Sequence, residues 1–351
     1  MTAETPRAVS PSAESPVCQL LERQAADYRG WWWVAPPRDP WLEAGQGVAV
    51  SADLAVRQAW QAAGRAAFSP FAPGLPGGEG APPGVVLFWP KSHALGEWWL
   101  LWLCATLPEG TPLELVGENQ GGIRRVLKVL AALGLGCRKR DSARRCSLFE
   151  TRLARVGIDP EAAWTPFEAD LGDERLTLVS HPGVFGHGKL DDGTRLLIET
   201  LSEAGRAPGG LAGEVLDLGC GDGILAAWLA RRGARVTAVD VNTFAVEATR
   251  RSLAANELTG EAQESDVYSA LGERTFDAIV SNPPFHQERA IDYGPAARLI
   301  EAAPAHLRPG GALVIVANAF LPYPDRLERA FGGFEILADD RRFRVYRAVR
   351  R

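Results

Sequence analysis

The sequence predicts an α/β protein with two domains in tandem, each built on a doubly wound and mostly parallel sheet. The chain has 351 residues, a length that suits two domains better than one. Its second half alternates short apolar strands with segments of helical spacing, which is typical of parallel sheets. Ten of the eleven tryptophans lie between Trp31 and Trp164, and this step in composition predicts a domain boundary beside Trp164.

We expect the first domain over residues 17–165 and the second over residues 166–351. A disordered tail is expected over residues 1–16, because this segment is rich in proline, serine and glutamate and has few large apolar residues.

The second domain contains most of the elements that can be predicted. A strand over 214–218 runs into a glycine-rich turn and then into a helix over 224–232. A buried strand over 276–281 ends in the segment Asn282-Pro-Pro-Phe285. The other predicted elements are helices over 194–201, 244–256 and 296–306, and strands over 235–240, 312–317, 334–337 and 343–349.

The first half repeats the last part of this pattern. Three of its segments resemble segments of the second half in the same order and at a nearly constant distance along the chain, which is typical of a duplicated domain. The first half has no glycine-rich turn, and Trp89-Pro-Lys91 stands where the second half has Asn282-Pro-Pro-Phe285. The paired segments are 85–90 with 279–283, 113–118 with 313–318, and 144–148 with 341–345.

Composition excludes several classes of protein. The net charge is −5, so there is no overall positive field to hold nucleic acid, and any contact with RNA must come from local patches. The longest apolar run, 98–107, is roughly half of the ~20 residues that a membrane span needs. Five dispersed cysteines and no metal-ligand spacing predict a cytoplasmic protein without disulfides or a metal site.

The turn over 219–223 predicts a cofactor site. Glycines between a strand and a helix let a ligand approach the backbone. Their Gly-x-Gly-x-Gly spacing differs from that of dinucleotide binding. Asp217 suits a cationic amino-acid group better than a pyrophosphate, and Asp240, at the end of the next strand, suits ribose hydroxyls. Together they fit S-adenosylmethionine, which carries a charged methionine and no phosphate.

Asn282-Pro283-Pro284-Phe285 predicts a site for an amino group. The prolines stiffen a loop that follows a buried strand, at the edge where α/β sheets bind ligands. Such a loop can hold the Asn282 side-chain oxygen and the Pro283 carbonyl as two acceptors for the two hydrogens of an exocyclic amine. Phe285 then offers a ring on which a base can stack. We expect Asn282, Pro283 and Phe285 to be the catalytic residues.

The second half resembles a class I S-adenosylmethionine-dependent methyltransferase of the group that methylates amino groups through this motif. More narrowly, the chain is similar to the ribosomal RNA small subunit guanine-N2 methyltransferase C family (RsmC type). The resemblance runs from about residue 85 to the C-terminus. Its motifs are residues 183–197, 215–221, 281–286 and 315–324, together with 88–91, 116–119 and 141–146 of the first half.

This resemblance implies two tandem Rossmann-like class I methyltransferase domains with an antiparallel C-terminal strand, the N-terminal one degenerate and unable to bind cofactor. Asp266 falls where the family meets the adenine amine, although related sequences often carry Asn there. The cofactor-binding residues implied in this way are Phe185, Asp192, Gly193, Thr194, Asp217, Gly219, Cys220, Gly221, Gly223, Asp240, Val241, Asp266, Val267 and Asn282.

The implied activity is transfer of a methyl group to the N2 amine of a guanine in 16S rRNA, with the small ribosomal subunit as partner and a monomeric enzyme. Two alternatives stay open at this point. The chain can methylate another amine, such as adenine N6 or a protein glutamine, or it can be an RNA-binding ribosome assembly factor whose methylation is incidental.

Two basic stretches are candidates for RNA binding. Residues 138–155 carry seven basic and two acidic side chains, and residues 341–351 carry six arginines and no acid. Charge runs are usually solvated faces, but these two occupy equivalent places in the two copies. The first domain is therefore expected to recruit RNA or to support the fold, and replacing residues 138–140 is expected to affect stability little. The candidates are Arg138, Lys139, Arg140, Arg144, Arg145, Arg341 and Arg342.

Overall fold

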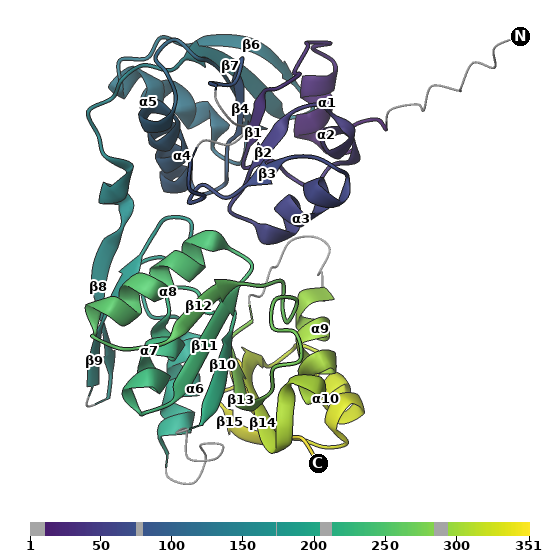
Figure 1. Cartoon of the computed structure of the whole chain (residues 1–351), viewed down its shortest axis with the longest axis vertical. Helices are drawn as coiled ribbons and strands as arrows, with labels where there is room; N and C mark the ends of the chain where they lie inside the picture. The colour runs from purple at the N-terminus through teal and green to yellow at the C-terminus, as the bar shows by residue number, and fades with distance from the viewer. Residues whose placement is uncertain (1–10, 75–79, 173, 204–212, 284–293) are drawn as a thin grey trace, which may run out of the picture. The chain divides into compact units, whose positions relative to one another are not determined.

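The computed structural model describes residues 11–74, 80–172, 174–203, 213–283 and 294–351 (Figure 1). The chain divides into two compact units, Met1–Ala163 and Trp164–Arg351. The division falls just before the predicted boundary because Trp164 packs within the second unit. Its ring lies 4.6 Å from the ring of His181, and the Arg251 guanidinium lies 4.3 Å above it.

The predicted tail is wrong for residues 11–16, which are ordered, while residues 1–10 lie outside the described residues. Helix α1 (Pro16–Glu22) is capped by Ser15, whose hydroxyl accepts from the Cys18 amide. The Ser15 amide in turn donates to the Asp39 carboxylate at 2.8 Å. Ala13 is only 6% exposed and joins the core. A composition rule cannot detect this segment, because its main partner, Asp39, lies far along the chain.

The sheet of the second unit has seven strands in the order β12-β11-β10-β13-β14-β16-β15, with β16 antiparallel to its neighbours and the preceding strands parallel. The antiparallel hairpin of β8 (Thr165–Leu171) and β9 (Glu174–Ser180), which precedes this sheet, was not among the predicted elements. The strands of the large sheet are β10 (Glu214–Leu218), β11 (Arg235–Asp240), β12 (Glu261–Glu264), β13 (Phe276–Ser281), β14 (Leu307–Asn318), β15 (Glu335–Asp339) and β16 (Phe343–Val349).

Helices cover both faces of this sheet, because successive strand residues point to opposite sides. Val215 packs into a core with helices α6 (Asp192–Ser202), α7 (Ile224–Arg231) and α8 (Thr243–Ala255). Leu216 packs into the other core with helices α9 (Gly294–Ala302) and α10 (Tyr323–Phe331). The layered arrangement leaves the carboxyl ends of the parallel strands available for ligands.

The first unit has the same strand order, β3-β2-β1-β4-β5-β7-β6, with β7 antiparallel to both of its neighbours. This correspondence confirms the predicted duplication and the predicted fold class. The strands are β1 (Trp32–Val34), β2 (Val48–Val50), β3 (Ala67–Phe68), β4 (Val85–Phe88), β5 (Pro112–Glu118), β6 (Arg138–Ala143) and β7 (Cys146–Arg152). The other helices are α2 (Pro40–Ala44), α3 (Leu54–Ala62), α4 (His93–Thr106) and α5 (Val126–Ala132).

Two loops of the first unit differ from the corresponding loops of the second unit, which face the expected ligands. Strand β1 is followed by Ala35-Pro-Pro37, whose prolines have no N–H to offer, instead of a glycine turn. Strand β4 is followed by Trp89, whose buried indole lies so close to Gly96 that an added Cβ there would be 2.6 Å from the ring. In the described part of the chain, no helix has the length and apolarity to cross a membrane.

Candidate functional site

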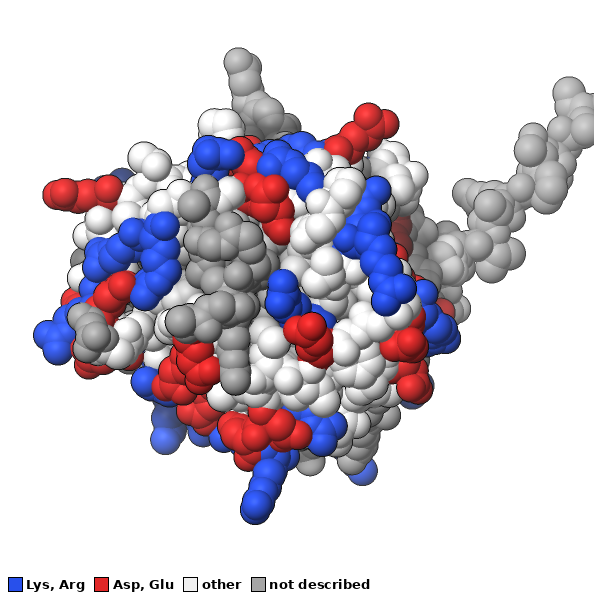
Figure 2. Space-filling view, turned by 90° about the horizontal axis from the view of Figure 1, so that it is seen from below, with Lys and Arg blue, Asp and Glu red and all other residues white. Residues whose placement is uncertain are grey.

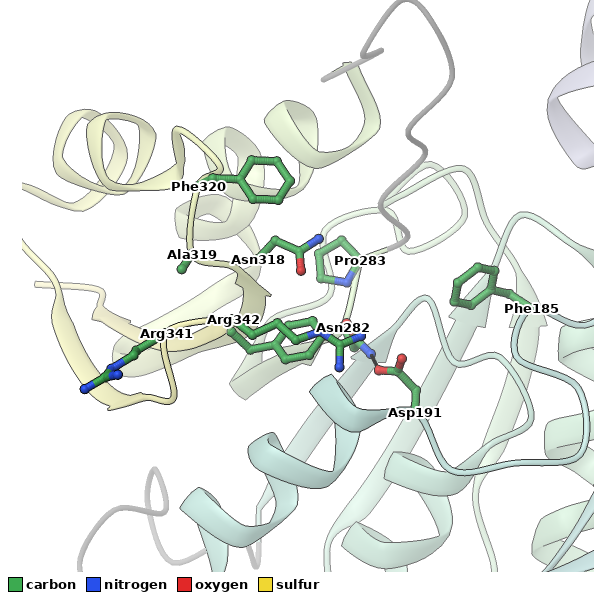
Figure 3. A pocket seen from close by; sticks show the side chains of 10 residues that line it. Phe185, Asp191, Asn282, Pro283, Asn318, Ala319, Phe320, Arg341 and Arg342 are labelled. Atoms are coloured by element: carbon green, nitrogen blue, oxygen red, sulfur yellow. Dashed lines mark hydrogen bonds between the residues drawn. The ribbon is translucent and has the colours of Figure 1, made fainter.

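A cavity of about 650 Å³ opens at the carboxyl edge of the second sheet (Figure 3). It is lined by residues from the ends of β13 and β14, from the turn between β15 and β16, and from the segment before α6. Phe185 and Phe320, both 67% exposed, lie on different sides of it. The lining residues are Phe185, Asp191, Asn282, Pro283, Asn318, Ala319, Phe320, Arg341, Arg342 and Phe343.

The side-chain amide of Asn282 is held in one orientation. Its Nδ2 donates to Asp191 Oδ2 and to Thr194 Oγ1, both at 2.8 Å. A carboxylate can only accept, so the atom facing Asp191 must be the amide nitrogen. Asp191 is itself fixed, because it caps α6 and accepts from the Thr194 amide at 3.1 Å. Both amide hydrogens of Asn282 are therefore used, and its Oδ1 remains as an acceptor at a cavity that Pro283 also lines.

The glycine turn between β10 and α7 has the backbone that the sequence indicates. Gly219, Gly221 and Gly223 have φ values of 81°, 56° and 83°, a region that favours glycine. A Cβ added at Gly219 or Gly221 would meet nothing within 4 Å, so the backbone there borders open space. The Asp240 carboxylate accepts from the Gly221 amide at 3.2 Å and from the Asn242 amide at 2.9 Å. These bonds hold Asp240 beside the turn.

Two acidic side chains near this turn are buried. Asp217 is completely buried, and among the described residues its carboxylate has no cationic partner. Burial raises the pKa of Asp217 to about 8, while the backbone amide of Ala226 acts in the opposite direction. Burial likewise raises the pKa of Asp222 to about 7. Buried carboxyl groups without a cationic partner fit a ligand that brings a positive charge, as S-adenosylmethionine does.

Two other predicted cofactor residues have their carboxylates engaged by arginines. Asp192 pairs with Arg342 at 2.7 Å, and Asp266 accepts from Arg298 through both oxygens. Gly193 lies so close to Asp191 that an added Cβ would be 3.0 Å from its Oδ2.

The remaining predicted residues lie along the same edge of the sheet, with one exception. Cys220 is buried within the glycine turn, and its amide donates to the Val239 carbonyl. Val241 follows β11, and Val267 follows β12 with a φ of 55°. Phe285 lies outside the described residues, so its predicted stacking role is not addressed by the structure.

The cavity also contains residues that were not predicted as site residues: Asp191, Asn318, Ala319, Phe320 and Phe343. The sequence could have indicated Asp191, since an aspartate three residues before Thr194 is a typical helix cap. Asn318 and Phe320 belong to the 315–324 segment, which supported the family resemblance without receiving a role.

Within the described ranges, some of the basic candidates form ion pairs at close distance and the others do not. Arg138 pairs with Glu150, Arg140 with Glu114, and Arg342 with Asp192. Among the described residues, no ion pair involves the side chains of Lys139, Arg144, Arg145 or Arg341. Arg144 and Arg145 form the β6–β7 turn, and Arg341 lies in the equivalent β15–β16 turn. On the face drawn in Figure 2, basic and acidic side chains are interspersed.

The expectation that replacing residues 138–140 affects stability little assumed that they are exposed charges with no buried partner, and this premise does not hold for Arg140. Its partner Glu114 is buried, and the hydroxyl of Tyr28 donates to the same carboxylate at 2.8 Å. Removing Arg140 leaves this buried carboxylate with one partner fewer, which is costly for folding. The run of charges in the sequence does not reveal this pairing, because Glu114 lies on a different strand.

The fold and this site define a methyltransferase. Residues 175–347 match the family model for the methyltransferase small domain, and residues 46–165 match that for its N-terminal domain.

Similar proteins narrow the choice among methyltransferases. The chain is 65% identical to the ribosomal RNA small subunit methyltransferase C of Chromohalobacter salexigens, over 97% of this chain and 99% of that protein. It is 45% identical to the protein of the same name from Pseudomonas aeruginosa, over 82% and 83% of the two chains. A solved structure of the Thermus thermophilus 16S rRNA N2 G1207 methyltransferase, in complex with AdoMet and guanosine, superposes with a TM-score of 0.83 at 30% identity, over 97% of this chain and 94% of that one.

The chain therefore belongs to the ribosomal RNA small subunit methyltransferase C family. This membership confirms the predicted family and, with it, S-adenosylmethionine as the cofactor.

Proposed function

We propose that this protein transfers a methyl group from S-adenosylmethionine to the exocyclic N2 amine of a guanine in 16S rRNA. The observation that carries the proposal is the orientation of Asn282. Asp191 and Thr194 use both of its amide hydrogens, so its Oδ1 is available to accept a hydrogen bond from a substrate amine. The relatives named above support the choice of guanine and of 16S rRNA.

The residues at the glycine turn fit the cofactor. We assign the buried Asp217 to its cationic methionine end and Asp240 to its ribose hydroxyls, with the open backbone at Gly219 and Gly221 between them. The cofactor supplies a methyl group on a positively charged sulfur, which is already activated for displacement. The chain must then place a nitrogen lone pair in line with that methyl group.

Asn282 and Pro283 perform this placement. An aromatic amine is a weak nucleophile because its lone pair is delocalised into the ring. Two acceptors, the Asn282 Oδ1 and the Pro283 carbonyl, hold the two amine hydrogens and favour a pyramidal nitrogen whose lone pair is available. Holding two reactants in a reactive geometry can contribute about 7–11 kcal/mol to lowering a barrier. The nitrogen loses its proton readily once it is methylated, so the reaction does not require a strong base in the cavity.

The base enters the cavity after flipping out of its surroundings, since an enzyme cannot reach an amine within a base-paired stack. We keep Phe285 as the expected stacking partner from the sequence, and Phe185 and Phe320 add two exposed aromatic rings at the cavity. We further expect a cytoplasmic monomer that acts on rRNA in the small ribosomal subunit. No observation among the described residues favours adenine N6, a protein glutamine or a purely non-enzymatic assembly role.

The test uses the purified full chain, isotopically labelled S-adenosylmethionine, and 16S rRNA or small subunits from a strain that lacks the gene. The proposal predicts label in N2-methylguanosine with the wild-type protein and none with Asn282→Ala. Label in N6-methyladenosine or in a ribosomal protein instead would contradict the proposal.

A further inference from the structure

Asn318 is the last residue of β14, and it lies next to the proposed amine site. The pairing of Ser281 with Ile315 places Asn282 one residue beyond the paired strand ends and Asn318 three residues beyond. A spacing of about 4.8 Å between strands and two residues along them separates the two Cα atoms by roughly 8 Å. Figure 3 shows the Asn318 amide beside Pro283, and both residues line the cavity.

The backbone of Asn318 is held firmly, whereas its side chain makes no contact of this kind within the part of the chain that the structure describes. Among the described residues, no hydrogen bond involves its side-chain amide. Its carbonyl accepts from the Leu321 amide at 3.0 Å, and its Cα pairs with that of Phe343 across the sheet. The preceding residues of β14 are buried. A rigid strand thus presents one donor group and one acceptor to the cavity.

These two groups match the edge of guanine. Beside its N2 amine, guanine carries the N1–H donor and then the O6 acceptor. A side-chain amide offers an oxygen and an N–H in one plane, so it can accept from N1–H and donate to O6 together. Adenine with its N6 amine in the same place presents the N1 acceptor next and then a C–H, so it can form at most one such bond.

We infer that Asn318 selects guanine by pairing with N1–H and O6 while Asn282 and Pro283 hold the amine. The inference rests on the proposed function, because it assumes that the amine at Asn282 is the N2 amine of guanine. It assigns the choice of base to a residue that does not touch the reacting nitrogen, and leaves Asn282 to position that nitrogen.

The test replaces the methylated guanine of the rRNA with 2-aminopurine, which keeps the amine but lacks N1–H and O6. Methyl transfer is measured in single turnover with wild-type protein and Asn318→Ala. The wild type should prefer guanine by about 10- to 100-fold, as for one bidentate base contact. Asn318→Ala should lose most of this preference, mainly by reacting more slowly with guanine. Phe320→Ala, which alters another lining residue, should slow both substrates by a similar factor and keep the preference.

Two kinds of failure are distinguishable. If wild-type protein transfers no methyl group to guanine N2, the proposed function fails. If the wild type methylates guanine but Asn318→Ala slows both substrates equally, Asn318 does not read the base and the inference is overturned. Thermal unfolding of Asn318→Ala should match the wild type, because its side chain has no partner among the described residues. If the variant does unfold at lower temperature, the ratio of its methyl-transfer rates on guanine and 2-aminopurine, measured on the folded fraction, still shows whether Asn318 selects the base.

Discussion

The most informative single substitution is Asp217→Asn. We expect the buried Asp217 carboxyl group to lower the stability of the fold and to contribute to cofactor binding. Burial raises the pKa of Asp217 to about 8 from its usual value of 3.8. At pH 7 the folded protein must keep a proton on a group that ionises in the unfolded chain. At about 1.4 kcal/mol per pH unit above the unfolded value, this costs about 4 kcal/mol.

The sign of the pH dependence follows from proton binding. Between pH 4 and pH 8 the folded state holds a proton on Asp217 and the unfolded state does not. The contribution of Asp217 to stability is therefore most favourable below pH 4 and is lost progressively as the pH rises to about 8. Asparagine has nearly the same shape and no charge, so it removes this pH-dependent cost.

The buried asparagine amide carries its own cost, about 1–3 kcal/mol without partners. We therefore expect Asp217→Asn to be more stable than wild type by about 1–3 kcal/mol near pH 7, and by more at pH 8. Its second unit should melt about 2–10 °C higher near pH 7. At pH 5 the advantage should disappear. The loss of a buried carboxylate opposite a cation should weaken S-adenosylmethionine binding by more than about 100-fold.

Scanning calorimetry of the full chain at pH 5 and pH 8, with titration calorimetry of cofactor binding, measures both effects. Asp325→Asn, at an exposed aspartate of α10 in the same unit, is the matched control and should leave cofactor affinity unchanged and unfolding nearly so. The reasoning is refuted if Asp217→Asn shows the same stability difference at both pH values, or if it binds S-adenosylmethionine as tightly as wild type.

Three further outcomes are expected. Asn282→Ala should abolish methyl transfer and leave S-adenosylmethionine affinity nearly unchanged in calorimetry; retained turnover would show that the amine is held elsewhere. Asp191→Ala, which releases the Asn282 amide, should lower kcat by about 10- to 100-fold with little change in cofactor affinity; partial rescue by Asp191→Asn, which keeps an acceptor oxygen, would separate positioning from a general loss of structure. Arg140→Ala should destabilise the first unit in urea unfolding by about 1–3 kcal/mol, because it leaves the buried Glu114 with one partner fewer. Lys139→Ala should change stability by less than about 0.5 kcal/mol and reduce the salt slope of RNA binding by about one. Equal stability of the two variants would contradict the account of this patch.

The elements of the second unit could be predicted because their signals are local. The strand over 214–218, its glycine turn and the strand over 276–281 each show apolar runs bounded by turn residues, and their bounds agree with β10 and β13. The first unit was harder to predict. Its strands β2 and β3 are only three and two residues long, which is too short for alternation to be visible.

The sequence indicates individual candidate residues of the site but not the contacts between them. The acceptor role of Asn282 was inferred from the stiffness of its loop, and the hydrogen bonds that orient it were not, because Asp191 lies 91 residues earlier in the chain. Arg140 and Glu114 show the same limit, since they are 26 residues apart and lie on different strands. Which charges are buried together depends on strand order, and no local pattern contains that information.

The central claim is that this chain makes N2-methylguanine in 16S rRNA. Mass spectrometry of 16S rRNA nucleosides, from a strain lacking the gene and from the same strain complemented with wild type or Asn282→Ala, tests this claim most directly. The account predicts that N2-methylguanosine at one position is lost on deletion, returns with the wild-type gene and does not return with the variant. An unchanged amount of N2-methylguanosine in the deletion strain, with loss of a different modified nucleoside, would contradict it.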